Sequence, residues 1–254
     1  MIALDTVITH LDELLRPAGW SDYCPNGLQV PNLSGVSHVV SGVSAHRALF
    51  ERAAAAGADL VLVHHGLFWN GEPLGIDRVR HARLKLLIDH DMALAAYHLP
   101  LDGHPEHGNN ALLARALGAV TTQPAFPHGG APIGVVADLG ADGVAAEELV
   151  DRVRAVAGRP DVLAFLDGPQ RVRHLGICCG AAADDLPAAV GLGCDAFLTG
   201  EPAERCMAIA REYGISFLAA GHHATERLGV QRLGALLAAR FGVGHEFVDV
   251  PNPI

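Results

Sequence analysis

The chain has 254 residues, half of them hydrophobic and 18% charged, and its formal net charge at pH 7 is −10. This length and composition suit one large or two small globular domains and exclude a mainly disordered protein. The apolar runs are too short for a transmembrane helix, so no membrane association is expected. The negative charge disfavours nucleic acid as a partner. An anionic small-molecule ligand is still compatible with this charge, because bound metal cations would dominate the electrostatic field at their binding site.

The cysteines and the N-terminal residues indicate the compartment. The five cysteines show none of the spacings typical of zinc ribbons or redox motifs, so we expect reduced, buried thiols. A secretory signal would begin with basic residues and an unbroken apolar stretch, whereas this chain places Asp5, Asp12 and Glu13 near its start. These features predict a cytoplasmic protein.

The first half of the chain alternates strands and helices. Apolar residues at helical spacing predict a helix over residues 2–15, and residues 21–30 are expected to form a loop. The following pattern predicts strands over residues 36–43, 60–63 and 92–98 and helices over residues 45–56, 79–90 and 110–117. Residues 36–65 therefore form a βαβ unit, for which a right-handed crossover is expected.

A change of composition separates the two halves. Residues 121–134 are rich in Thr, Pro and Gly, and we expect them to separate an N-terminal lobe, residues 1–120, from a C-terminal lobe, residues 121–254. Downstream, strands are predicted over residues 134–139, 162–165, 172–178, 196–199, 215–220 and 247–250, and helices over residues 145–157, 186–190, 203–212 and 226–241. The predicted fold class is a two-lobed α/β protein.

The strand over residues 60–63 is followed by two adjacent histidines. Its unbroken apolar sequence predicts a buried parallel strand, which delivers His64 and His65 to the edge where open α/β sheets bind ligands. Neighbouring side chains in a regular strand point to opposite faces. Both imidazoles can therefore face one site only if the strand ends there and Gly66 turns the backbone. An imidazole pair at this edge indicates a metal site.

Two further strand ends carry possible ligands. His98 is followed by Asp102, and the strand over residues 215–220 is followed by His222 and Glu226. Thr225 is a suitable N-cap for the last helix, whose N-terminal dipole would favour Glu226 as a bridging carboxylate. Each motif alone is more often structural, but together they favour metal. Imidazoles with two carboxylates suit Zn²⁺, Mn²⁺, Fe²⁺ or Ni²⁺, without choosing among them, and paired ions are common in hydrolases.

At this point a family resemblance becomes specific. The blocks that carry it are Val-His-His-Gly-Leu-Phe-Trp-Asn-Gly-Glu (63–72), His-Leu-Pro-Leu-Asp-Gly-His-Pro-Glu-His-Gly-Asn-Asn-Ala (98–111), Leu-Thr-Gly-Glu (198–201), Ala-Ala-Gly-His-His-Ala-Thr-Glu-Arg (219–227), Pro-Asn-Gly-Leu-Gln-Val (25–30) and the terminal Pro-Asn-Pro. Over its whole length the chain resembles the short bacterial form of the Nif-three-like family. These are hexameric proteins with a dinuclear metal centre, often labelled GTP cyclohydrolase I type 2 homologues.

The resemblance implies a two-lobed protomer with a metal pair in the cleft between lobes, assembled into a ring-shaped homohexamer. The implied metal ligands are His64, His65, Asp102, His222 and Glu226. We expect His65 and Asp102 on one ion, His64 and His222 on the other, and Glu226 shared between them.

Further residues of these blocks are expected near the site. We expect His98 to support the ligands or to act with Glu226 in catalysis. Glu201 is expected either to contact substrate or to cap a structural element, and His104 either to contact substrate or to be solvated. Ser44 stands where many relatives carry Asp, and Cys24-Pro25 replaces the Trp-Asp found in many of them. Neither departure removes a ligand, but each removes an acidic side chain.

Two classes of function follow. The first is a metal-dependent hydrolase, in which two ions assist hydroxide attack on a carbon or phosphorus centre of a small molecule, with GTP suggested by the family label. The chain has no Gly-x-x-x-x-Gly-Lys-Ser/Thr loop, so a nucleotide would be bound in another way. The second is a non-catalytic metal-binding ring that serves as a metal chaperone, a metallocofactor-assembly factor or a scaffold.

Overall fold

In a computed structural model, which describes all residues from 1 to 254, the chain forms two compact units. The first comprises Met1–Leu101 and Gly229–Pro251, and the second comprises Asp102–Leu228 and Asn252–Ile254. Both contain a β-sheet and helices, so the predicted α/β class is confirmed.

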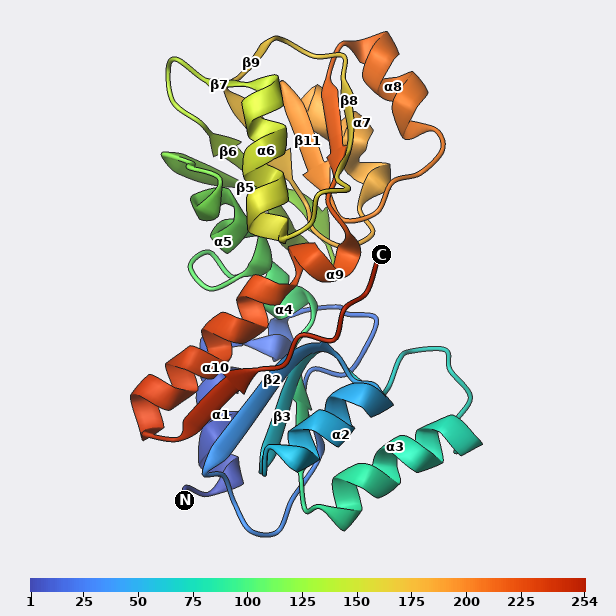
Figure 1. Cartoon of the computed structure of the whole chain (residues 1–254), viewed down its shortest axis with the longest axis vertical. Helices are drawn as coiled ribbons and strands as arrows, with labels where there is room; N and C mark the ends of the chain where they lie inside the picture. Colours follow the sequence, from blue (N-terminus) through green and yellow to red (C-terminus); the bar gives the residue numbers. More distant parts are fainter. The chain divides into compact units, whose positions relative to one another are not determined.

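The first unit contains a five-stranded sheet in the order β1-β4-β3-β2-β13, in which β1 is antiparallel to β4 and the other strands are parallel. Figure 1 shows β2 and β3 side by side in this sheet. Its elements are α1 (Leu4–Leu15), η1 (Pro17–Gly19), β1 (Gly27–Val30), β2 (His38–Ser44), α2 (Arg47–Ala55), β3 (Leu60–His65), α3 (Arg78–Asp89), β4 (Ala93–Ala96), most of α10 (Arg227–Phe241) and β13 (Gly244–Phe247), with α4 (Leu99–Asp102) at its boundary.

Alternation along β3 explains why helices cover both faces of this sheet. Leu60 and Leu62 pack in one cluster with apolar residues of α1 and α10. Val61 and Val63 belong to a second cluster with residues of α2 and α3. Because successive strand side chains point to opposite faces, an uninterrupted apolar strand needs a helical layer on each side. The predicted βαβ unit is confirmed as β2, α2 and β3, with the two strands parallel.

The second unit contains a six-stranded sheet in the order β5-β6-β10-β11-β12-β8, with only β10, β11 and β12 parallel to one another, and a small sheet of β7 and β9. Its elements are α5 (Asn109–Ala116), β5 (Thr121–His128), β6 (Ala131–Asp138), β7 (Val144–Ala145), α6 (Ala146–Ala157), β8 (Leu163–Leu166), β9 (Arg171–Val172), β10 (His174–Ile177), η2 (Ala183–Asp185), α7 (Leu186–Gly191), β11 (Ala196–Thr199), α8 (Cys206–Tyr213), β12 (Ser216–Ala219) and α9 (His222–Thr225).

The structure corrects several element predictions. Residues 121–134 are not a linker, because β5 and β6 form an antiparallel hairpin there, turning at Gly129 and Gly130, both with positive φ. Thr and Pro suit such an edge strand as well as they suit a linker. The loop over residues 21–30 ends in β1, and the last strand is Gly244–Phe247, earlier than predicted.

The division of the chain differs from the expected lobes at residues 1–120 and 121–254. The second unit already begins at Asp102, and the chain returns to the first unit at Gly229. The return has a clear cause, because β13 pairs with β2 and residues of α10 pack in the first hydrophobic cluster. Backbone pairing between distant segments leaves no local signal in the sequence.

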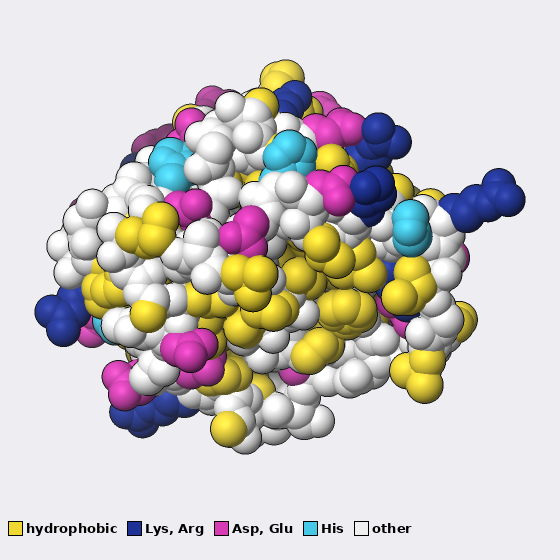
Figure 2. Space-filling view, turned by 90° about the horizontal axis from the view of Figure 1, so that it is seen from below, with side chains coloured by type: hydrophobic (Ala, Val, Ile, Leu, Met, Phe, Trp, Pro, Cys, Tyr) yellow, Lys and Arg dark blue, Asp and Glu magenta, His cyan; other side chains and the backbone are white.

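The surface includes apolar side chains. No helix of the structure is long and apolar enough to span a membrane. Leu33, Leu74 and Ile76 are nevertheless exposed, at 97%, 100% and 63% of their surface. Figure 2 shows a face on which hydrophobic side chains gather towards the middle and charged side chains lie mostly around them. Contiguous apolar surface of this kind often marks a protein interface.

Candidate metal centre

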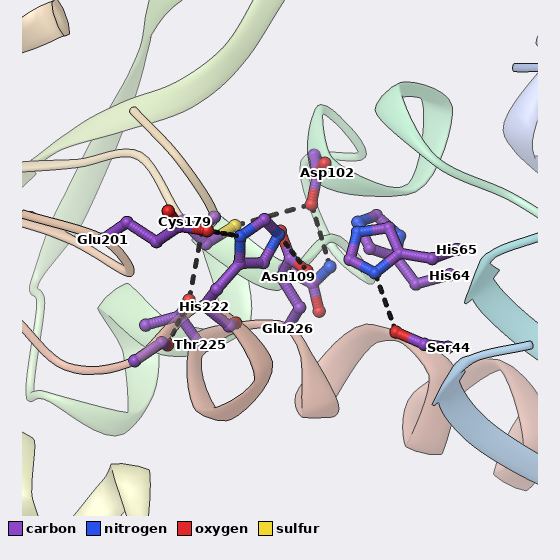
Figure 3. Close-up of polar contacts among 12 residues, drawn as sticks. Ser44, His64, His65, Asp102, Asn109, Cys179, Glu201, His222, Thr225 and Glu226 are labelled. Carbon is purple, nitrogen blue, oxygen red and sulfur yellow. Dashed lines mark hydrogen bonds and ion pairs between the residues drawn. The ribbon is translucent and has the colours of Figure 1, made fainter. Parts of the chain in front are cut away.

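In the first unit, His64 and His65 lie at the carboxyl end of β3. Their ring centroids are 4.7 Å apart, and His64 is completely buried. Nδ1 of His64 lies 2.9 Å from the backbone oxygen of Tyr97, which follows β4. Nδ1 of His65 lies 3.0 Å from Oγ of Ser44, the last residue of β2 (Figure 3). Each ring is thus held by the end of a different neighbouring strand.

This geometry corrects the expected role of Gly66. β3 continues through both histidines, since His65 still pairs with Ser44 of β2, and Gly66 is not among the residues with positive φ. A side chain on Gly66 would instead collide with the amide of Gln29. That amide accepts a hydrogen bond from the backbone N–H of Leu67 at 2.8 Å. Gly66 is therefore needed for the close approach of Gln29, not for a left-handed turn.

His98 joins the same imidazole cluster. His64, His65 and His98 offer ring nitrogens that all lie within 4.8 Å of one another. Nδ1 of His98 lies 2.7 Å from Oδ1 of the buried Asp22, and its backbone N–H donates to Oδ1 of Asn26 at 2.7 Å. Although burial alone would raise the pKa of Asp22, hydrogen bonding and charge from His98 outweigh it and lower that pKa. His98 thus lies beside the histidine pair, and its role as a supporting or acid/base residue stays a prediction.

In the second unit, His222 lies between two carboxylates. Nδ1 of His222 is 2.5 Å from Oε1 of Glu201, and Nε2 is 3.1 Å from Oε2 of Glu226. Burial alone would lower the pKa of His222, but the two carboxylates outweigh it and raise that pKa to about 9. Without a metal, the ring is therefore protonated at neutral pH. A cation bound at Nε2 would replace that proton.

Asp102 and Glu226 are buried carboxylates of the second unit. They are exposed over only 5% and 3% of their surface, and they offer oxygens within 4.8 Å of each other. Nδ2 of Asn109 donates to Oδ1 of Asp102 at 2.8 Å, and the thiol of Cys179 lies 3.5 Å from the same oxygen. Burying two negative charges so close together is costly without compensating positive charge. The pair is a suitable site for a divalent cation.

The absence of a side chain at Gly180 leaves room for Glu226 and His222. A Cβ on Gly180, whose φ is +71°, would lie 2.5 Å from Oε1 of Glu226 and 3.3 Å from Nε2 of His222. Thr225 is not the predicted N-cap of the last helix. Its hydroxyl lies 3.0 Å from the carbonyl of Gly221 and 2.9 Å from that of His222, within the single turn of α9. Glu226 follows that turn and directly precedes α10.

The predicted substrate residues have definite positions. Glu201 contacts Nδ1 of His222 and is partly exposed. His104 lines a pocket of about 120 Å³ together with Asp102 and several prolines. Its ring stacks on that of His107 at 4.7 Å, and burial, followed by the charge of His107, lowers its pKa. Substrate contacts by Glu201 and His104 remain predictions.

The chain is similar to known proteins over almost its whole length. A family profile described as Duf34/NIF3 (NGG1p interacting factor 3) matches residues 2–253. The chain belongs to this family. A Pseudomonas aeruginosa protein named GTP cyclohydrolase 1 type 2 homolog is 46% identical over 252 residues, which cover 99% of each chain. The Escherichia coli K12 protein of the same name is 41% identical over 246 residues, 96% of each chain.

Three solved structures share the whole fold of this chain. The protein ybgI, described as of unknown function, superposes with a TM-score of 0.93 at 40% identity over 100% of both chains. TTHA1606 from Thermus thermophilus gives a TM-score of 0.90 at 34% identity, also over 100% of both chains. HcgD from Methanocaldococcus jannaschii, at 18% identity and a TM-score of 0.85 over 98% of both chains, shows the fold alone.

The sequence gives no direct signal for several supporting residues of this DUF34/NIF3 chain. Asp22 lies 76 positions from His98 and has no motif linking it to that histidine. The sequence marks Ser44 only as a departure from relatives, yet its hydroxyl contacts His65. Asn109 belongs to a block of the family resemblance, but nothing in that block predicts its contact with Asp102. The one sequence signal for these residues is that polar side chains close to a strand end can hydrogen-bond the candidate ligands there.

Proposed function

We propose that this protein binds two divalent metal ions through His64, His65, Asp102, His222 and Glu226 and uses them to hydrolyse a small-molecule substrate. The family supplies the ligand set by resemblance. The distribution proposed is His65 and Asp102 on one ion, His64 and His222 on the other, and Glu226 on both.

One observation carries the proposal: every histidine of this set has its Nδ1 engaged by an oxygen. The partners are the carbonyl of Tyr97 for His64, the hydroxyl of Ser44 for His65 and the carboxylate of Glu201 for His222. Metal-binding histidines in proteins characteristically use one ring nitrogen in this way, which fixes the ring and leaves the other to bind the ion. In all three residues Nε2 would therefore be the ligand atom.

The carboxylates add a second, electrostatic argument. Asp102 and Glu226 are buried within 4.8 Å of each other, and Asn109 orients Asp102 by donating a hydrogen bond. Oxygen and imidazole nitrogen donors together suit Zn²⁺, Mn²⁺, Fe²⁺ and Ni²⁺. The donor set therefore fits a pair of first-row divalent ions.

When bound, two such ions would act as Lewis acids and would lower the pKa of a water molecule bound to them, so that hydroxide would be available at neutral pH. The side chains contribute the remaining chemistry. Asp22 holds Nδ1 of His98 and leaves its Nε2 able to hold or pass a proton. His98 is therefore the candidate acid/base residue. Trp69, whose ring lies 5.4 Å from that of His98, shields one side of it.

The substrate class comes from relatives only. The Pseudomonas aeruginosa and Escherichia coli proteins are named GTP cyclohydrolase 1 type 2 homologs. We include GTP, phosphoesters and cyclic amides as substrate candidates, since each is cleaved by attack of water on a carbon or phosphorus centre. The proposal also keeps the hexameric ring, for which the exposed Leu74 and Ile76, which line one hollow with Phe68 and Trp69, form a candidate contact area.

The decisive experiment measures metal content by plasma mass spectrometry and hydrolysis of this substrate panel on the same preparations. We expect close to two ions per chain in the wild type and a loss of at least one in Glu226→Gln. Glu212→Gln, which changes an exposed acid of α8, is the matched control and should keep both ions.

The two parts of the proposal fail separately. Absence of stoichiometric metal after reconstitution would contradict the metal centre. Two ions without turnover of any substrate in the panel would contradict the hydrolase and favour a metal chaperone, a cofactor-assembly factor or a scaffold. Light scattering on the same samples tests the hexamer, since a monomeric mass would contradict the ring.

A further inference from the structure

A separate cluster of metal-ligand side chains lies in the second unit. It consists of His128 at the end of β5, Cys178 directly after β10, and Asp185 at the end of η2. Their ligand atoms all lie within 4.8 Å of one another, and Nε2 of His128 is 2.9 Å from Oδ2 of Asp185. None of the three belongs to the ligand set proposed above.

The adjacent cysteines contribute to different groups. The thiol of Cys179 lies 3.5 Å from Oδ1 of Asp102. That of Cys178 belongs instead to the cluster with His128 and Asp185. Neighbouring side chains at the end of a strand diverge in this way because they point to opposite faces. The cluster around Cys178 is therefore distinct from the carboxylates of the proposed metal centre.

The cluster has the composition and access of a zinc site. It offers one sulfur, one imidazole nitrogen and one carboxylate oxygen, a combination that suits borderline-soft divalent ions. Zinc bond lengths place tetrahedral ligand atoms about 3.4–3.6 Å apart, so only small side-chain movements are needed. Cys178 is fully buried, whereas the side chain of His128 is 33% exposed and gives an ion a route from solvent.

We propose that His128, Cys178 and Asp185 form a mononuclear site for a thiophilic divalent cation of the Zn²⁺ type, with the fourth coordination position open to water. Binding replaces the thiol proton of Cys178 by the ion, and the proton leaves to solvent without any redox change. A thiolate, a carboxylate and a neutral imidazole then balance the two positive charges of the ion. This site goes beyond the proposed hydrolase, because it shares no ligand with it and requires no turnover.

Cobalt provides a specific test, because only a sulfur ligand gives a thiolate-to-cobalt charge-transfer band in the near ultraviolet. The full chain, stripped of metal under reducing conditions, is titrated with Co²⁺ without oxygen. We expect the band in the wild type and its loss in Cys178→Ser. In His128→Gln the Co²⁺ concentration for half-saturation should rise by at least about tenfold.

Matched variants separate this site from other cysteines and from the proposed metal centre. Cys194→Ser, Cys179→Ser and Glu226→Gln should all keep the charge-transfer band. Absence of the band in the wild type, its persistence in Cys178→Ser, or its loss in Cys179→Ser would overturn the proposal. If circular dichroism shows that Cys178→Ser does not fold, the test rests on His128→Gln, which changes a partly exposed side chain. An unchanged Co²⁺ concentration for half-saturation in His128→Gln would then overturn the proposal.

Discussion

The two units of this protein prepare their candidate ligands in different ways. In the first unit the ligands are imidazoles, and the ends of neighbouring strands fix them through Tyr97 and Ser44. In the second unit two carboxylates are buried close together, with His222 bonded to one of them and to Glu201. Neutral donors can be assembled without an ion at little electrostatic cost, whereas adjacent buried acids need positive charge.

This difference predicts that charge in the second unit dominates metal affinity. Glu226→Gln removes a negative ligand proposed for both ions, and we expect metal affinity to fall at least about 100-fold, equivalent to roughly 2.7 kcal/mol. His65→Gln removes one neutral donor from one ion, so its effect should be smaller. Competition with a fluorescent chelator measures both affinities. An effect of His65→Gln that equals or exceeds that of Glu226→Gln would contradict the comparison.

The close packing in the second unit gives the next largest effect. Gly180→Ala places a Cβ against Glu226 and should destabilise the fold by about 1–3 kcal/mol while also weakening metal binding. Gly193→Ala is the matched control, because Gly193 has a similar φ of +72° with nothing within 4 Å of its Cβ. Urea unfolding and metal titration of both variants check this. Equal metal affinity in the two variants would show that a side chain at position 180 does not disturb metal binding through Glu226.

Partners of the ring nitrogens should have intermediate effects. Glu201→Gln and Ser44→Ala each remove or weaken a hydrogen bond to Nδ1 of a proposed ligand, and such changes typically reduce metal affinity about 10–100-fold. The larger reduction should come from Glu201→Gln, because its bond is charge-assisted. Metal affinities of the two variants, measured in parallel, rank these contacts. If Ser44→Ala weakened metal binding more than Glu201→Gln does, His65 would depend on its hydroxyl partner more strongly than His222 depends on its carboxylate partner.

The smallest predicted effect is slow alkylation of two thiols, Cys24 and Cys194, which lie outside the proposed ligand set. Burial, reinforced by Asp22 for Cys24 and by Asp195 for Cys194, raises their pKa values to about 12 and about 11. A raised thiol pKa favours the neutral form, so at pH 9 only about one-hundredth of Cys194 is thiolate.

Alkylation by iodoacetamide, followed by peptide mass spectrometry, should therefore be slow at both thiols and accelerate as the pH rises towards these values. Unfolding in urea should remove the protection. Rapid modification of the folded protein at pH 8 would contradict the buried environment of Cys24 and Cys194.

Local patterns predicted most helices and strands because each depends on neighbouring residues. The strand over residues 196–199 matches β11, and the helix over residues 145–157 differs from α6 by one residue. Local patterns do not predict the hairpin at residues 121–134, because Thr and Pro are compatible with both a linker and an edge strand. Its identity depends on pairing with β10 through β6.

The sequence by itself determined which candidate ligands the chain offers, since histidines and acids at strand ends are local features, and it determined family membership through its blocks. Only the tertiary structure decided what holds those ligands. Asp22 reaches His98, Ser44 reaches His65, and the thiol of Cys178 joins His128 and Asp185. The physical reason is that a hydrogen bond or a metal site depends on distances of a few ångströms in space, which sequence separation does not encode.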